Sequence, residues 1–361
     1  MITLSGKFQQ APYTLYLGKD LLLRPELLLP GLPNKQVLIL SHPSLAPYHK
    51  QLRKNFLGYQ CNDMVLPSGE QEKSLRNAEK VISFLIEKSH QRQSTLIALG
   101  GGVIGDLGGF ISAIYLRGIN FIYIPTTLLA QVDATLGGKC AVNHATGKNL
   151  IGTFHHPSRI IIDINTLLTL SDRAFYAGLA EAIKHGIALD EAYFTWLEEH
   201  IDQIRARDPD TLITLIQKSL VIKKNIVEAD EKDLAGKRAL LNFGHTFGHA
   251  IEHATNYQLL HGESVSMGMQ IAAHISYDHQ LICKNTLDRI GTLLRRAGLY
   301  EHLPHCEIDL LAYKQALLKD KKNTGNALNM ILLTKVGHAF QQEVNWLSAQ
   351  KYFHKNLFQT F

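Results

Sequence analysis

The chain has 361 residues, of which 45% are hydrophobic and 19% charged, a composition typical of globular proteins that excludes intrinsic disorder. At roughly 150 residues per domain, this length predicts about two domains. The formal net charge is only +5 and the basic residues are scattered, so we expect a small anionic substrate rather than nucleic acid.

The sequence predicts neither disulfides nor a membrane segment. The cysteines are far apart and form no CxxC pair, which excludes a thiolate zinc finger and favours a reducing cytoplasm; they are Cys61, Cys140, Cys283 and Cys306. The N-terminal segment lacks the pattern of a signal peptide. The most apolar stretch, residues 110–130, is interrupted by Arg117, Asn120 and Pro125. We therefore expect a cytoplasmic protein without a membrane span.

The first half of the chain alternates β-branched runs with helical patterns. The predicted buried strands are residues 36–41, 95–100, 120–125 and 159–163. Between them, as at residues 74–89, apolar side chains recur at helical spacing. This alternation predicts parallel pairing in an α/β, Rossmann-like, doubly wound domain.

After residue 163 the long periodic segments predict helices, and residues 330–337 are a short strand-like exception. We therefore expect an α/β domain over residues 1–168, followed by a mostly α-helical domain over residues 169–361.

Three consecutive glycines, Gly100, Gly101 and Gly102, stand between a predicted strand and an apolar helical pattern. Glycines at such a turn let the backbone approach a pyrophosphate, and a helix N-terminus offers free N–H groups. The spacing GGGxxGD differs from GxGxxG, so a tight, closely packed turn is the alternative. Thr126 and Thr127 follow the next strand, and two polar loops at the carboxyl ends of strands favour a bound dinucleotide.

Histidines are concentrated in residues 245–261, where four of the 18 occur: His245, His249, His253 and His261. Residues four apart share a helix face, so His245 and His249 can point into one cavity, with His261 returning from a later loop. His-xxx-His pairs also form hydrogen bonds within cores, and spacing does not say which two histidines would ligate a metal.

Glu181 lies in the segment GLAEAIKHG, where helical spacing places Lys184 and His185 on its face. Two histidines and a glutamate around an ion with an open position are typical of a catalytic zinc site. The pattern therefore makes Glu181 the candidate carboxylate ligand of a divalent metal.

Basic and amide side chains recur in stretches otherwise rich in apolar residues and glycine: Lys139, Lys148, Asn149, Lys184, Lys224, Arg238 and Asn242. Arginine binds carboxylate or phosphate through two hydrogen bonds, while lysine acts as a movable point charge. Lys139 and Lys148 lie nine residues apart in a segment that we interpret as a glycine-rich loop. Taken singly, each lysine fits a solvated surface residue better; together they favour an anion site.

Several long motifs occur in order between about residues 65 and 325: SGEQEK, GGGVIGDLGGF, YLRG, IPTTLLAQVDATLGGKCAVNHATGKNLIGTFHHP, GLAEAIKHG, RALLNFGHTFGHAIE, HGESVSMGM and DKK. In this set the sequence resembles the 3-dehydroquinate synthase family of sugar-phosphate cyclases. The resemblance implies a Rossmann-like domain, a helical domain and a homodimer.

The resemblance also implies roles for individual residues. The family's zinc ligands match Glu181, His245 and His261. Its NAD contacts match Glu70, Lys73, Gly101, Gly102, Asp106, Thr126, Thr127, Lys139, Lys148 and Thr169. Its substrate positions match Asp133, Lys139, Asn149, Lys184, Lys224, Arg238, Asn242, His249 and, of the two lysines in DKK, Lys322 rather than Lys321. Arg117 matches an arginine that reaches the neighbouring subunit's substrate. His42 stands where the family commonly offers an acidic or amide residue to the ribose, so no ribose contact is assigned there.

The implied activity converts 3-deoxy-D-arabino-heptulosonate 7-phosphate into 3-dehydroquinate and phosphate, in the shikimate pathway of aromatic amino acid biosynthesis. The implied enzyme is a carbon–oxygen lyase that uses one divalent ion, zinc or cobalt, and NAD that is reduced and reoxidised within one turnover. The alternatives are another sugar-phosphate cyclase, a metal- and NAD-dependent polyol dehydrogenase of the glycerol type, and a nucleotide-binding regulatory module. The dehydrogenase would release NADH, and its neutral substrate would not need so many cationic side chains.

Overall fold

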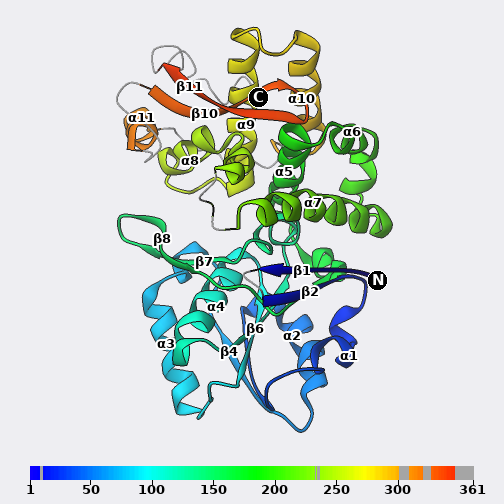
Figure 1. Cartoon of the computed structure of the whole chain (residues 1–361), viewed down its shortest axis with the longest axis vertical. Helices are drawn as coiled ribbons and strands as arrows, with labels where there is room; N and C mark the ends of the chain where they lie inside the picture. Colours follow the sequence, from blue (N-terminus) through cyan, green and yellow to red (C-terminus); the bar gives the residue numbers. More distant parts are fainter. Residues whose placement is uncertain (9–10, 232, 234–235, 301–308, 320–326, 346–361) are drawn as a thin grey trace. The chain divides into compact units, whose positions relative to one another are not determined.

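The computed structural model describes residues 1–8, 11–231, 233, 236–300, 309–319 and 327–345 (Figure 1). The chain divides into two compact units, Met1–Leu170 and Ser171–Phe361. In the part of the chain that the structure describes, no helix is both long and apolar enough to cross a membrane.

A seven-stranded sheet forms the centre of the first unit, in the order β1-β2-β9-β6-β5-β3-β4. Its strands are β1 (Ile2–Phe8), β2 (Ala11–Gly18), β3 (Gln36–Ser41), β4 (Gln60–Val65), β5 (Thr95–Gly100), β6 (Asn120–Pro125) and β9 (Arg159–Asp163). The neighbours from β2 to β4 pair in parallel, which confirms the predicted α/β class. The β1–β2 pair is antiparallel and adds an edge that the prediction did not include.

The parallel strands are buried on both faces, because alternate residues enter two different hydrophobic clusters. In β3, Val37 and Ile39 pack on one side of the sheet, and Leu38 and Leu40 pack on the other. The helices around this sheet are α1 (Pro25–Leu28), α2 (Ala46–Arg53), α3 (Leu75–Glu87) and α4 (Gly102–Ile114).

The order of the strands reverses between β3 and β5. From β3 the chain moves outward to β4, and it then returns to place β5 on the opposite side of β3. In open parallel sheets, ligands bind at the carboxyl ends of the strands at such a reversal. Because Gly100 ends β5, the three consecutive glycines lie at this point of the sheet.

The prediction of a glycine-rich loop from Gly137 to Asn149 is wrong, because most of this segment belongs to an antiparallel hairpin. Strands β7 (Lys139–His144) and β8 (Gly147–Phe154) pair with Lys139 opposite Phe154. The register shifts between Val142 and His144, and the glycines and short polar side chains hide the alternation of a strand. The hairpin brings the two lysine-bearing segments side by side.

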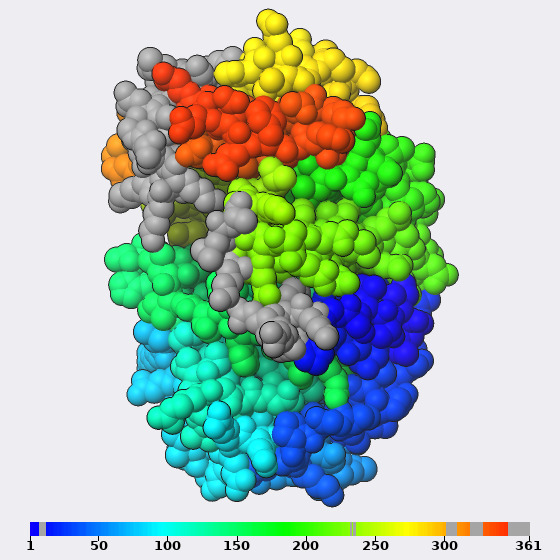
Figure 2. Space-filling view, in the orientation of Figure 1, coloured from blue at the N-terminus to red at the C-terminus, as the bar shows by residue number. Residues whose placement is uncertain are grey.

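The second unit is mostly helical, as predicted. Its helices are α5 (Asp172–Leu189), α6 (Glu191–Arg205), α7 (Pro209–Ala229), α8 (His245–Ala254), α9 (His261–Asp278), α10 (Lys284–Arg296) and α11 (Leu310–Lys319). The strand-like run at 330–337 belongs largely to β10 (Ala327–Lys335), which pairs with an unpredicted strand, β11 (His338–Asn345). Figure 2 shows this hairpin in orange and red as a band on the surface of the second unit.

Candidate active site

Glu181 lies in the middle of α5, a helix that is buried on all sides from Phe175 to Ala188. Its side chain is 1% exposed, and one carboxylate oxygen, Oε2, accepts a hydrogen bond from the ammonium group of Lys184. The lysine is three residues further along the helix, so the predicted shared face is confirmed. A carboxylate so deeply buried needs such a partner, because an unpaired charge would cost several kcal/mol to bury.

His245 is the first residue of α8, and His249 follows one turn later on the same side. The Nδ1 atom of His245 lies 3.3 Å from the carbonyl oxygen of Phe243. A carbonyl oxygen can only accept, so this contact places the hydrogen on Nδ1 and leaves the Nε2 lone pair available. Burial, reinforced by the nearby Lys184 ammonium, holds the pKa of His245 well below its ordinary value. A neutral imidazole of this kind is the form that binds a metal.

His261 is the first residue of α9. The prediction that it lies in a loop is therefore wrong. The carboxylate of Glu263 accepts the backbone N–H of Leu260 at 2.7 Å and two hydrogen bonds from Arg173, at 2.6 and 2.8 Å. This arrangement ties the start of α9 to α5. Gly262 lets the two backbones approach closely, because a Cβ atom there would lie 1.7 Å from the carbonyl oxygen of Ala177.

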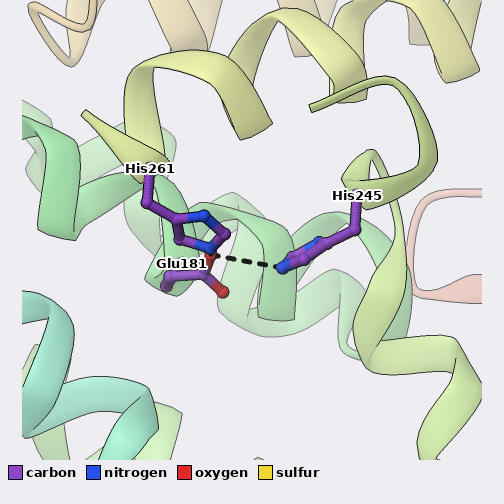
Figure 3. A group of neighbouring side chains, drawn as sticks. All are labelled: Glu181, His245 and His261. Carbon is purple, nitrogen blue, oxygen red and sulfur yellow. Dashed lines mark ion pairs between the residues drawn. The ribbon is translucent and has the colours of Figure 1, made fainter. Parts of the chain in front are cut away.

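These three elements bring Glu181, His245 and His261 together, with the two imidazoles facing the carboxylate (Figure 3). Oε1 of Glu181 lies 3.3 Å from Nε2 of His261 and 3.7 Å from Nε2 of His245. Ligand atoms 2.0–2.1 Å from a tetrahedral zinc ion would lie roughly 3.4 Å apart. The donor types and their spacing therefore fit one divalent metal ion.

Glu252 is a further member of this cluster that the sequence analysis did not identify. It lies on α8, is 5% exposed, and places Oε2 3.4 Å from Nδ1 of His261. Burial by itself lowers the pKa of His261, but hydrogen bonds to Glu181 and Glu252 outweigh it and raise the pKa to about 10. The spacing to His249, three residues earlier, was the available signal. His249 itself is exposed, with its ring stacked at 5.8 Å from that of His261.

The other predicted anion-binding residues of this unit lie on two neighbouring elements. Arg238 is buried on the short helix η8 (Lys237–Asn242), which Asn242 ends, and it donates a hydrogen bond to the carbonyl oxygen of Glu231 at 3.0 Å. Lys224 lies on α7 and pairs with Glu228 at 3.6 Å. Lys321 and Lys322 lie outside the described residues.

In the first unit, Gly101 caps α4 and Gly102 is its first residue. A Cβ atom at Gly102 would meet no atom within 4 Å, whereas one at Gly101 would lie 2.8 Å from Cγ2 of Thr127. The backbone is therefore open in front of the helix N-terminus, and one of the two predicted threonines stands next to it. An open helix N-terminus at the carboxyl end of a strand fits a pyrophosphate.

A polar network connects the segment after β4 with the β7–β8 hairpin, and Asn143 is its centre. The side-chain amide of Asn143 donates to Glu70 Oε1 at 2.8 Å, and its oxygen accepts the backbone N–H of Asn149 at 2.9 Å. Its own N–H donates to the carbonyl of Lys73 at 2.8 Å. Lys73 is buried and pairs with Asp106 of α4. The structure thus joins predicted residues through Asn143, which the sequence analysis missed because an asparagine in an apparent loop carries no distinctive signal.

The remaining predicted residues of this unit are more dispersed. Thr126 is buried and its N–H donates to the carbonyl of Gly100 at 3.1 Å, whereas Lys139 is exposed on β7. Asp133 lies in the π-helical turn Ala130–Ala134, and Lys148 lies in β8. Thr169 lies near the end of the unit, where its hydroxyl oxygen is 3.3 Å from the hydroxyl oxygen of Tyr48. Arg117 is exposed ahead of β6, and His42 contacts Ser44 and Ser68.

Two solved structures share this fold over nearly the whole chain. A 2-deoxy-scyllo-inosose synthase complexed with carbaglucose-6-phosphate, NAD⁺ and Co²⁺ is 26% identical, with a TM-score of 0.88 over 98% of this chain and 99% of that one. A 2-epi-5-epi-valiolone synthase from Streptomyces hygroscopicus with NAD⁺ and Zn²⁺ is 25% identical, with a TM-score of 0.85 over 96% and 97%. The fold is that of the sugar-phosphate cyclases.

Family models give the particular assignment. Residues 63–177 match the N-terminal model of 3-dehydroquinate synthase and residues 178–323 match the C-terminal one. The 3-dehydroquinate synthase of Coxiella burnetii (strain CbuK_Q154) is 46% identical over 91% of both chains. The chain belongs to the 3-dehydroquinate synthase family and is an enzyme with that cyclase activity, as its sequence predicts. An iron-containing alcohol dehydrogenase, 14% identical with a TM-score of 0.63, shares the fold alone.

Proposed function

We propose that the chain converts 3-deoxy-D-arabino-heptulosonate 7-phosphate into 3-dehydroquinate and phosphate, as a carbon–oxygen lyase that depends on NAD and on one divalent ion, zinc or cobalt. The observation that carries this proposal is the buried set Glu181, His245 and His261 with Lys184 beside it. It is supported by two structural relatives, which hold NAD⁺ together with Co²⁺ or Zn²⁺.

In this proposal Glu181, His245 and His261 would hold the metal, because Oε1 of the carboxylate lies close to Nε2 of each imidazole. When bound, the ion would polarise a substrate hydroxyl, and NAD would accept and later return the hydride of that carbon. Lys184 holds the second oxygen of Glu181 by a hydrogen bond, so the carboxylate presents its other oxygen to the ion. The lysine thereby keeps the ligand in one orientation.

The nucleotide is assigned to the first unit, with its pyrophosphate at the N-terminus of α4. Gly102 leaves the space that a side chain would otherwise fill, and the first N–H groups of the helix favour an anion there. Asp106, a residue of this helix, pairs with Lys73. We assign Glu70, Thr126, Thr127, Lys139, Lys148 and Thr169 as further NAD contacts.

The substrate carries about three negative charges, from one carboxylate and one phosphate monoester. We assign the carboxylate to Arg238, Lys224 and Lys322, because a guanidinium group can bind both carboxylate oxygens. The phosphate group is assigned to Lys139, Asn149, Asn242 and His249, and Asp133 to the remaining substrate contacts.

Oxidation at C5 acidifies the C6 proton, and phosphate then leaves by β-elimination. We assign removal of the C6 proton to the departing phosphate. The reason is that the buried carboxylates Glu181 and Glu252 are both engaged in contacts with His261. Reduction of the C5 carbonyl, ring opening and an intramolecular aldol addition complete the carbocycle.

The test supplies the heptulosonate phosphate, NAD and zinc or cobalt to the purified protein and follows phosphate and NADH together. Phosphate should far exceed the added NAD, and no NADH should accumulate. Stoichiometric NADH would instead indicate a polyol dehydrogenase, and no turnover with this substrate would overturn the substrate assignment.

We also propose a homodimer in which Arg117 contacts the substrate phosphate of the neighbouring subunit. Arg117 is exposed, and it and the preceding Leu116 both have positive φ angles, 66° and 48°. Two successive residues with left-handed backbone conformation cost free energy. Such strained conformations are found more often at functional positions than elsewhere. Arg117 also precedes β6, whereas sites in this fold form at the opposite ends of the strands.

The dimer is tested at substrate concentrations well below KM, where Arg117→Ala chains are nearly inactive, by mixing them with inactive Lys184→Ala chains. A hybrid dimer would contain one intact site and one site that lacks both groups, so activity should return. Losing a charge-assisted contact to phosphate should weaken substrate binding by about tenfold to a hundredfold in the Arg117 variant. Continued inactivity despite demonstrated subunit exchange would contradict the shared site.

A further inference from the structure

His261 lies between two buried carboxylates. Its Nε2 atom is 3.3 Å from Oε1 of Glu181, and its Nδ1 atom is 3.4 Å from Oε2 of Glu252. Both carboxylates are buried, with side-chain exposures of 1% for Glu181 and 6% for Glu252. Each ring nitrogen of His261 therefore faces its own acceptor.

One helix provides both a candidate ligand and this second acceptor. His245, His249 and Glu252 are spaced four and three residues apart on α8, which places them on one side of the helix. The rings of His245 and His261 are 5.3 Å apart, so the side of α8 that carries the ligand also faces the start of α9. Glu252 is thus built into the element that carries His245.

An imidazole that binds a metal through one nitrogen carries its single hydrogen on the other nitrogen, and a second hydrogen held by His261 in the metal-free protein is replaced by the ion. The partner of the hydrogen-bearing nitrogen decides which nitrogen binds the metal. For His245 the partner is the Phe243 carbonyl at 3.3 Å, a backbone group that no side-chain substitution removes. For His261 the corresponding partner is the side chain of Glu252.

We infer that Glu252 is a positioning residue of the metal centre, which accepts the Nδ1 hydrogen of His261 so that Nε2 faces Glu181 and His245. This inference rests on the proposed metal site. It gives the two histidine ligands matching arrangements, each with Nδ1 held by an oxygen acceptor and Nε2 directed at the ion.

A second set of possible ligands, His249, Glu252 and His261, overlaps the first. An ion there would use Nδ1 of His261 and an exposed histidine, His249. The first set is favoured because Phe243 has already oriented His245 toward Glu181 and because Lys184 anchors that carboxylate. Under this assignment Glu252 orients a ligand and does not bind the ion itself.

The experiment compares Co²⁺ binding by metal-stripped wild type, Glu252→Leu, Glu252→Gln and a control, His253→Gln. His253 is exposed on the same helix, next to Glu252 in sequence. Cobalt is titrated against a competing chelator, and its visible absorption reports the ligand geometry. Leucine removes the acceptor and should weaken Co²⁺ binding by about 10- to 100-fold. Glutamine keeps an acceptor oxygen and should weaken it less, and the control should match wild type.

The second measurement is ¹⁵N NMR of histidine-labelled protein loaded with zinc. In wild type, Nδ1 of His261 should carry the hydrogen and Nε2 should show the shift of a metal ligand. Glu252→Gln should keep this pattern and Glu252→Leu should lose it. Circular dichroism of the metal-free proteins checks folding, and the glutamine variant carries the test should the leucine variant unfold.

The outcomes separate this inference from the proposed function. If wild type binds no ion, or His245→Ala binds one normally, the metal site itself is wrong. If wild type binds one ion and both Glu252 variants keep its affinity and the Nδ1 signal, the positioning role is overturned and the metal site stands. If the glutamine variant loses the ion altogether while His245→Ala keeps it, Glu252 is a ligand and the second set is correct.

Discussion

The two units form their candidate sites from different materials. In the first unit the central feature is backbone: a strand that ends in glycine, an open helix N-terminus at Gly102, and space where a side chain would stand. In the second unit the central feature is a group of buried ionisable side chains on α5, α8 and α9. N–H groups at a helix start suit an anion, and carboxylate and imidazole donors suit a cation.

This difference has energetic consequences. A site made of backbone groups buries few charged side chains, so it costs the fold little stability. An added Cβ atom can nevertheless block it. A site of buried charges destabilises the fold unless each charge has a partner, and loss of one partner leaves the other uncompensated. The second unit compensates through pairs, such as Lys184 with Glu181 and Arg173 with Glu263. We therefore expect side-chain changes to be more damaging in the second unit.

The largest expected effect comes from His245→Ala. Loss of a ligand should remove the metal, and with it several kcal/mol of transition-state stabilisation, so turnover should fall by roughly a thousandfold or more. Metal content measured by atomic absorption and turnover measured by phosphate release check this, and a chelator should inactivate wild type in the same way. His249→Ala is the matched control and should keep the metal while slowing the reaction. Metal loss in His249→Ala alone would mean that the ligand assignment is wrong.

The next largest effect is expected for Glu263→Ala. This change removes the acceptor of the Leu260 N–H and leaves Arg173 without its carboxylate. Because the arginine is a third exposed, we expect the free energy of unfolding to fall by about 2–3 kcal/mol, below the range for a fully buried pair. Urea denaturation measures it, and Co²⁺ affinity should fall too because His261 starts the same helix.

The control for this pair is Asp288→Ala, which breaks the exposed Lys284–Asp288 pair on α10, 2.8 Å apart. Exposed pairs contribute about 0–1 kcal/mol, so this variant should unfold almost like wild type. Equal losses in the two variants would show that the buried pair has no special role.

A smaller effect separates two glycines of α4. Gly109→Ala would place a Cβ atom 2.2 Å from Sγ of Cys140, so we expect unfolding to become easier by about 1–3 kcal/mol. Gly102→Ala meets no atom within 4 Å, so stability should stay the same or rise slightly while NAD affinity falls by about tenfold or more. Thermal unfolding and NAD titration by calorimetry measure the two properties. Unchanged NAD affinity in Gly102→Ala would argue against the backbone site.

The smallest effect concerns thiol reactivity and should leave activity unchanged. Burial raises the pKa of Cys140 to about 12 and that of Cys61 to about 11, whereas hydrogen bonds from Thr286 lower the pKa of the exposed Cys283. Because the thiolate is the reactive form, Cys283 should be alkylated first of these three at pH 8. Peptide mass spectrometry after brief iodoacetamide treatment gives the order, and earlier labelling of Cys140 would contradict the packing around Gly109.

The sequence by itself determined the elements with strong local signals. The run TLIALG predicts a strand because six apolar and β-branched residues in a row suit a strand buried on both faces, and all six are buried. The helix at 75–87 follows from its spacing and from Ser74, which caps it. The motifs likewise predicted the family, because a family is recognised by which residues occur at which positions of the sequence.

The tertiary structure decided what depends on partners distant in the chain. The hairpin β7–β8 has weak alternation, and only pairing across the turn makes it a sheet. His261 stands at a helix start because Glu263 and Arg173, 90 residues apart in the chain, anchor that end. Asn143 and Glu252 gain their roles only through contacts with Glu70 and His261. The residue type alone sets which donor and acceptor groups a side chain offers. Which partner those groups meet depends on packing, and packing is a property of the folded chain.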